Sequence, residues 1–218
     1  MLETTSPAAS IFRLGRKPDP WEPPDWSRAL PDGTFGNRFD DPSGNYRVLY
    51  AASQRVSCFV ETLARFRPDL SLLAELQAIE GKDDYVPLGK VPSDWCDARL
   101  MGECSVDGSY ADIYAAEWVG YLRRELAADC VALGIKDLDV SVLQQAEPRR
   151  LTQIASLKVY EASLEGIYYR SRYGHDLENW ALFEPFQIHS RQIAIAIDPG
   201  DADLQRACTI LGLRMEHG

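Results

Sequence analysis

Two polar stretches that lie far apart in the sequence carry the residue types needed to hold an anion and to place one carboxylate beside it. The first is residues 36–40 (GNRFD), followed by a strand-like run that ends near Tyr50 and then by Glu61. The second is residues 166–172 (GIYYRSR). Arg side chains can donate two parallel hydrogen bonds to phosphate oxygens, and Arg13 lies inside another apolar run. We interpret the stretches as two halves of a site for a nucleotide.

Each candidate also has a structural interpretation. Glu61 lies about 140° from the centre of its helix's apolar stripe at roughly 100° per residue, so a solvated side chain explains it when it is taken alone. Arg38 could be a surface turn residue paired with a neighbouring aspartate, and Arg13 could face outward from its strand. Tyr50 could be an ordinary sheet aromatic. Only their combination favours a functional reading.

Ser171 is a candidate because alternation along its strand puts it on the same face as Tyr169, so it could point into a cleft. It has no evident His base, since His175 is four residues away in a loop-like stretch. The chain has no G-x-S-x-G elbow and no Gly-rich phosphate loop. These patterns disfavour hydrolysis by an activated Ser and disfavour a Rossmann dinucleotide site.

The elements that must position these residues follow from hydrophobic periodicity. We expect Ser53 to cap the helix that carries Glu61. Strands and helices interleave irregularly rather than in βαβ units, which predicts an α+β fold with a mainly antiparallel sheet. The expected strands cover residues 11–14, 46–52, 167–173, 180–183 and 192–197, and the expected helices cover residues 56–66, 70–79, 111–132, 151–164 and 202–211.

The length of 218 residues fits one domain that buries its own core. We expect a single domain over residues 1–218 with an insertion at about 81–110. A Pro-rich loop at about 17–34 cannot form regular helix or sheet, and we expect Trp21 and Trp26 to pin it to the core.

The composition limits the classes of function. A net charge of −10 repels long polyanions, so direct nucleic-acid binding is not expected, whereas short basic runs suffice for a small anion. The five cysteines form no Cys-x-x-Cys pair, and the three histidines show no metal-ligand spacing. No apolar run approaches the length of a spanning helix. We expect a cytoplasmic protein without metal or membrane contact.

Taken together, these motifs resemble the RES-domain family, the toxin components of bacterial toxin–antitoxin pairs. The family usually has G-x-R-[FW]-N where this chain has residues 36–40, so that Asp40 stands in place of Asn and adds negative charge near a phosphate site. Each matching motif is short, but the order and spacing of the motifs along the chain make the combination specific. The matching pieces are Phe12-Arg13, residues 36–40, Leu49-Tyr50, Glu61, residues 166–172 and Leu182-Phe183.

The resemblance implies a fold similar to ADP-ribosyltransferases, with a split sheet, flanking helices and a cleft for NAD+. It also implies cleavage of the nicotinamide–ribose bond, with NAD+ as substrate and no metal. Carried over by position, Arg13 and Arg38 would hold the pyrophosphate or its surroundings, Tyr50 and Tyr169 would contact the dinucleotide, and Glu61 and Ser171 would complete the site.

The leading hypothesis is therefore an NAD+ glycohydrolase or phosphorylase that acts as a toxin. A protein ADP-ribosyltransferase differs only in the acceptor, and a non-catalytic nucleotide-binding or interaction module would bind NAD+ without turnover. The resemblance implies an antitoxin partner of the Xre type, with a helix-turn-helix. The sequence leaves the acceptor and the oligomeric state open, a homo-oligomer included.

Overall fold

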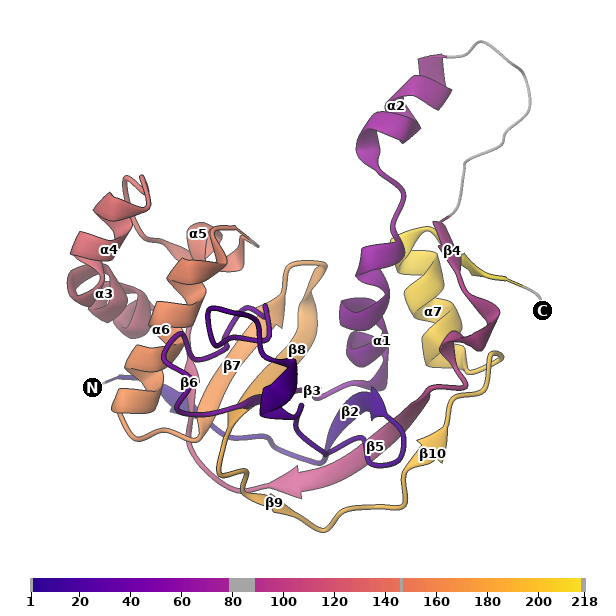
Figure 1. Ribbon diagram of the computed structural model, residues 1–218, viewed down its shortest axis with the longest axis horizontal. Coiled ribbons are helices and arrows are strands. Elements are labelled where there is room, and N and C mark those ends of the chain that lie inside the picture. Colours follow the sequence, from indigo (N-terminus) through magenta and orange to yellow (C-terminus); the bar gives the residue numbers. More distant parts are fainter. Residues whose placement is uncertain (1, 79–88, 146, 217–218) are drawn as a thin grey trace.

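The computed structural model describes residues 2–78, 89–145 and 147–216 (Figure 1). Within these residues nine strands form one curved sheet in the order β1-β6-β7-β8-β3-β2-β5-β10, with β9 pairing to β5, and β4 and β11 form a separate parallel pair. The strands are β1 Thr4–Thr5, β2 Ile11–Arg16, β3 Val48–Ala52, β4 Gly89–Val91, β5 Arg99–Val106, β6 Tyr110–Asp112, β7 Gly166–Ser171, β8 Gly174–Phe183, β9 Ile188–His189, β10 Ile195–Ala196 and β11 Leu213–Met215.

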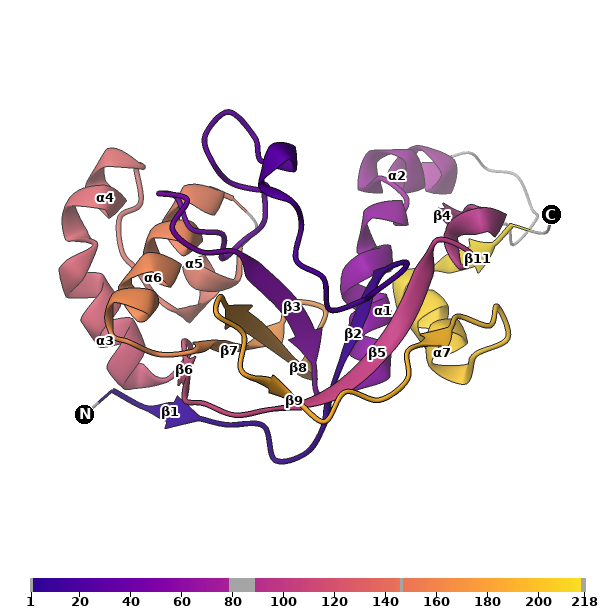
Figure 2. The same ribbon diagram turned by 60° about the horizontal axis from the view of Figure 1, so that its bottom comes forward.

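The helices gather in two groups at opposite ends of the sheet, as both views show (Figures 1 and 2). The first group contains α3 Ala116–Glu125, α4 Ala127–Ala132, α5 Val140–Gln144 and α6 Arg149–Glu161. The second group contains α1 Arg55–Leu63 and α7 Ala202–Leu211, and α2 Leu70–Ala78 extends beyond α1. Three short 3-10 turns complete the described elements: η1 Trp26–Arg28, η2 Ala64–Phe66 and η3 Ser93–Trp95.

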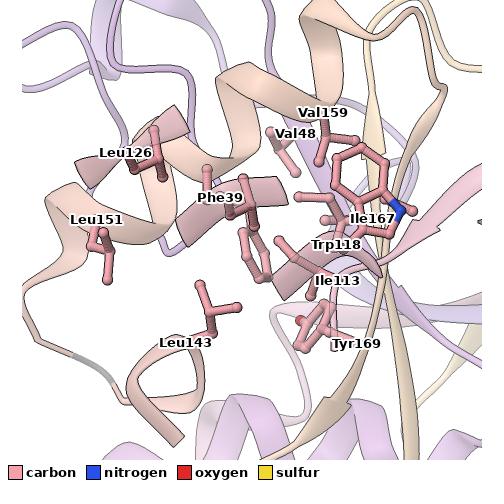
Figure 3. Close-up of a cluster of buried hydrophobic side chains, with 14 of the residues drawn as sticks. Phe39, Val48, Ile113, Trp118, Leu126, Leu143, Leu151, Val159, Ile167 and Tyr169 are labelled. Atoms are coloured by element: carbon pink, nitrogen blue, oxygen red, sulfur yellow. The ribbon is translucent and has the colours of Figure 1, made fainter. Parts of the chain in front are cut away.

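Two hydrophobic cores lie on the same face of the sheet, one under each group of helices. Val48 belongs to the core under α3 and α6, whereas Ala52 belongs to the core under α1 and α7. Residues two apart on a strand share a face, so Tyr50 lies between the two cores. Figure 3 shows the first core, in which Phe39 and Tyr169 pack with Trp118, Ile113 and their neighbours. The gap between the cores is therefore where a cavity can form.

The sheet divides between β2 and β3. Only Phe12 and Ala52 pair across this junction, whereas β2 pairs with β5 at six positions and β3 pairs with β8 at five. The strands β2 and β3 thus diverge after this one pair. β2 is held by its pairing with β5, and β3 by its pairing with β8. This division separates the part of the sheet under α1 and α7 from the part under α3 and α6.

The predicted fold class is confirmed. The strands of the large sheet pair antiparallel except for β6 with β7, and helices cover one face at both ends. The sequence periodicity placed the helix of residues 202–211 at the bounds of α7, and residues 111–132 contain two helices after the short strand β6.

The predicted cap of α1 is wrong. The N-cap residue is Gln54, whose side chain makes no capping bond. Ser53 instead accepts a hydrogen bond from the indole Nε1 of Trp180, at 2.9 Å. Trp180 is buried, and a buried indole N–H requires a hydrogen-bond partner, which the Ser53 hydroxyl supplies. Local sequence could not reveal this competition, because Trp180 lies on another strand.

The strand predicted for residues 192–197 is also largely wrong. Only Ile195 and Ala196 pair, with β5, and both are exposed at the edge of the sheet. Ile193 is 92% exposed and Ile197 alone of the three isoleucines is buried. The apolar residues do alternate, but Ile193 and Ile195 remain exposed at this edge of the sheet.

The predicted anchoring of the Pro-rich loop holds for buried Trp21, whereas Trp26 is exposed and lies against Phe35 and Arg47.

The expected insertion at about 81–110 falls partly outside the described residues. Its second half contains β5, which pairs with β2 in the large sheet over residues 99–104. None of the described helices is both long and apolar enough to cross a bilayer.

Candidate active site

An open cavity of about 440 Å³ lies between the two groups of helices. Its walls come from the loop before β3, from α1 and η2, from the β7–β8 hairpin, and from the end of α5 and the start of α6, which approach from the opposite side (Figure 1). A smaller cavity of about 130 Å³ adjoins it and shares Tyr50, Glu61, Thr62 and Tyr169. The large cavity is lined by Asn37, Arg38, Tyr50, Glu61, Thr62, Ala64, Arg65, Gln144, Arg149, Tyr169, Arg172 and Tyr173.

Glu61 is positioned by the helix that follows β3. The buried stripe of α1 includes Val56, Phe59, Val60 and Leu63, which fixes the rotation of the helix against the sheet. Glu61 is off this stripe and exposed, as the periodicity predicts, but the space that it faces includes both cavities. Among the described lining residues of the two cavities it is the only acidic one.

Arg38 is held from several sides. Its Nη2 donates to the Tyr114 hydroxyl at 2.9 Å and to the carbonyl oxygen of Leu143. The guanidinium carbon lies 5.0 Å from the ring centre of Phe39 and 5.5 Å from that of Tyr169. Its Nε is buried without a hydrogen-bond partner among the described residues. Arg38 therefore lies as a fixed cation in the cavity wall rather than as a mobile surface residue.

Asp40 organises the loop that presents Arg38. It is 3% exposed, and its Oδ2 accepts from the backbone N–H groups of Phe35, at 2.9 Å, and Asn37, at 2.7 Å. The Tyr50 hydroxyl accepts from the backbone N–H of Phe39 at 2.9 Å and lies 3.4 Å from the other carboxylate oxygen of Asp40. Burial raises the pKa of Asp40 despite these bonds. The acidic residue thus faces its own loop, and it does not line either cavity.

Asp40→Asn is expected to stabilise the protein at neutral pH. An Asn carbonyl oxygen can accept the same two backbone N–H bonds, and it removes a charge that burial disfavours. Because the pKa of Asp40 is raised on folding, its ionisation lowers stability as the pH rises through that pKa. We expect a gain on the order of 1 kcal/mol at pH 7, or about 2–4 °C in Tm. Thermal melts should show that gain shrinking to nothing under acid conditions; a Tm unchanged or lower at pH 7 would contradict the reading.

The two predicted tyrosines come together at the floor of the cavity. Tyr50 projects from β3 and Tyr169 from β7, and both line both cavities. Burial raises the pKa of each phenol well above its ordinary value, and for Tyr169 the nearby Glu61 carboxylate raises it further. Both tyrosines are therefore neutral, and they offer ring faces and hydroxyl groups rather than a phenolate.

Arg13 fills the division between β2 and β3. Its Nη1 donates to the carbonyl oxygen of Tyr50 at 2.7 Å, and its Nε donates to that of Pro20 at 2.6 Å. The guanidinium thus joins β2 to β3 where backbone pairing has stopped. Burial lowers the pKa of Arg13 to about 10, which still leaves it charged at neutral pH. Arg13 lines the smaller cavity and not the larger one.

Ser171 is not among the residues that line either cavity. It is 3% exposed at the end of β7, and its hydroxyl oxygen accepts from the backbone N–H of Tyr173 at 3.1 Å. The strand register shifts between Arg170 and Ser171, so simple alternation no longer predicts which way the residue faces. Ser171 supports the turn that carries Arg172 and Tyr173 into the cavity wall.

Three cavity arginines were not singled out from the sequence. Arg65 comes from η2, Arg149 from the start of α6 and Arg172 from the β7–β8 turn. Arg149 also donates through Nη1 to the carbonyl oxygen of Gly36, which ties α6 to the Arg38 loop. The basic pairs at 149–150 and 170–172 were the available signal, but nothing local linked them to one site. With Arg38, four arginines face one carboxylate in a chain of net charge −10.

The site offers no activated thiol. Cys58 lines the smaller cavity, and burial raises the pKa of its thiol to about 12. Within the described part of the chain, no group of three or more His, Cys, Asp or Glu residues is arranged to hold a metal ion. The lining can therefore bind an anion, stack against rings and place one carboxylate, which is the chemistry of charge stabilisation rather than of covalent attack by Cys.

The comparisons with known proteins agree with this architecture. A chain of the crystal structure of the M. tuberculosis MbcT–MbcA toxin–antitoxin complex is similar in fold, with a TM-score of 0.51 and 12% sequence identity over 94% of this chain and 92% of that one. No curated protein matches the sequence. The family model of the RES domain matches residues 10–203, which include every predicted site residue. The chain belongs to the RES-domain family.

Proposed function

We propose that this protein cleaves the bond between nicotinamide and ribose in NAD+. The observation that carries the proposal is one carboxylate, Glu61, facing a cavity whose other charged lining residues, within the described part of the chain, are four arginines. A dinucleotide has the matching features: a pyrophosphate for the arginines, two ring systems for the tyrosines, and a ribose carbon that becomes positive during cleavage. The cavity volume lies within the range of roughly 300–1,000 Å³ that is typical of small-molecule sites.

The reaction needs only one acidic residue. The C1′–N bond breaks with its electron pair going to the nicotinamide nitrogen, so nicotinamide leaves as a neutral molecule without needing a proton. The ribose then has oxocarbenium character, as in glycoside hydrolysis. An oxygen of water, phosphate or a protein side chain forms the new bond to C1′ and loses a proton to solvent. Glu61 would stabilise the positive ribose more in the transition state than in the ground state.

The remaining residues would bind and orient the dinucleotide. Arg38 is fixed by Tyr114 and Leu143, so its charge is available at little entropic cost. Tyr50 and Tyr169 would contact the nicotinamide side, beside Glu61. Arg13 would act from the smaller cavity, through the nitrogen that its backbone contacts leave free. Ser171 would contribute by shaping the turn at Tyr173.

The experiment is to follow NAD+ loss with the purified chain and to identify the products by chromatography. Free nicotinamide with ADP-ribose would indicate a glycohydrolase, and a phosphate-dependent product would indicate a phosphorylase. Labelled NAD+ added with a cell lysate would reveal a protein ADP-ribosyltransferase through label on protein. NAD+ binding without any turnover would reject the proposed reaction and favour a binding module.

The biological role that we propose is that of a toxin held in check by an antitoxin in the cytoplasm. Its support is membership of the RES-domain family and the fold shared with a chain of a toxin–antitoxin complex. All five cysteines are free and buried, as suits a reducing compartment. Growth arrest on induced expression, relieved by an adjacent helix-turn-helix protein, would support this role, and unimpaired growth with full NAD+ turnover would contradict it.

A further inference from the structure

The carboxylate of Glu61 is connected to the interior through one side chain. The Asn179 amide Nδ2 donates to Glu61 Oε1 at 3.2 Å, and its Oδ1 accepts from the Ser57 hydroxyl at 2.8 Å. A carboxylate can only accept, so the amide nitrogen must be the end that faces Glu61. The orientation of the Asn179 amide is thereby determined at both ends.

Ser57 and Glu61 lie four residues apart on α1, so they occupy the same face of the helix. Asn179 contacts both of them from β8, across the interface between helix and sheet. Ser57 is fully buried and Asn179 is 2% exposed, whereas Glu61 is exposed. The network therefore joins the buried interior to Glu61, the one carboxylate among the described residues that line the cavity.

Asn179 is itself held in place by strand pairing on both sides. It pairs with Ala52 of β3 on one side and with Tyr169 of β7 on the other, so its backbone lies in the middle of three strands. An exposed Glu side chain otherwise samples several rotamers, and fixing it costs conformational entropy. A donor on a central strand reduces that freedom before a substrate arrives, which is preorganisation.

We propose that Asn179 is a positioning residue for Glu61, and that Ser57 orients Asn179. Nδ2 of Asn179 fixes Oε1, and Oε2, which makes no hydrogen bond to the described residues, is left to face the ribose. Nothing in this arrangement requires Asn179 to contact the substrate. The inference rests on the proposed function, because positioning is measured through NAD+ turnover.

Asn179→Ala should lower kcat for NAD+ loss by roughly 10- to 100-fold, by analogy with the loss seen when the hydrogen-bond partner of a metal-ligating side chain is removed. KM should change less than about twofold. Ser57→Ala should lower kcat less, because the amide keeps its bond to Glu61. Ser53→Ala is the matched control. It removes a hydrogen bond from Trp180, the neighbour of Asn179 on β8, without touching Glu61, and should leave kcat unchanged.

Asn179→Asp gives a readout that a loss of packing would not produce. The variant keeps the shape and the bond from Ser57, but it sets a second carboxylate at hydrogen-bond distance from Glu61, and such a pair shares a proton. The acidic limb of the pH–kcat profile should move to higher pH by one unit or more, and activity should recover under alkaline conditions.

The results separate this inference from the proposed function. A wild-type chain without NAD+ turnover would overturn both. If the wild-type chain turns over NAD+ while Asn179→Asp has a normal kcat and an unmoved pH profile, the positioning role alone is overturned. The same conclusion follows if kcat falls no further in Asn179→Ala than in Ser53→Ala. If Asn179→Ala does not fold, the isosteric Asp variant decides the question, with thermal melts confirming that it is folded.

Discussion

Glu61→Gln is expected to lower kcat for NAD+ cleavage by roughly 10²–10³-fold, the cost of removing one preorganised electrostatic contact to a transition state. Gln has the shape of Glu, and its carbonyl oxygen can still accept from Asn179 Nδ2. The variant therefore removes the charge and keeps the geometry. KM should change little if the carboxylate acts mainly on the positive ribose of the transition state.

The fold of this variant should be intact, because the buried stripe of α1 is untouched and Glu61 is exposed. Thermal melts should agree with wild type within about 2 °C. Glu125→Gln makes the same chemical change at an exposed position of α3, outside the lining of both cavities, and should keep full activity. Normal turnover by well-folded Glu61→Gln protein would rule out the single-carboxylate mechanism.

Arg38→Ala is expected to weaken NAD+ binding by about 1–3 kcal/mol, or roughly 5- to 150-fold in Kd, through the loss of charge-assisted bonds to phosphate. The substitution also removes the donor to Tyr114 and to the Leu143 carbonyl, so some loss of stability should accompany it. Isothermal titration with NAD+ below the melting temperature separates the two effects.

Arg38→Lys distinguishes charge from geometry. Lys keeps the positive charge but cannot make the forked contact or hold Tyr114 and Leu143 together with a ligand, so binding should be intermediate. Arg206→Ala removes an equal charge from an exposed position of α7 and should leave Kd unchanged. Equal Kd values for wild type, Arg38→Ala and Arg206→Ala would remove Arg38 from the binding site.

The sequence by itself determined which residue types each segment carries. Its apolar periodicity also predicted where most helices and strands lie along the chain. Apolar periodicity located α1 and α7, and the off-stripe position of Glu61 followed from counting along one helix. Motif order indicated the RES-domain family, which the family model confirms over residues 10–203. These are local properties, since the pattern within one element fixes which of its faces is buried.

Only the tertiary structure decided which residues share the cavity. It brought Arg65, Arg149 and Arg172 beside Arg38, turned Asp40 toward its own loop, and kept Ser171 out of the lining. It also paired Asn179 with Glu61, 118 residues away in the sequence. Such contacts depend on how strands pair and on where a sheet divides, and both are set by long-range packing that no local pattern records.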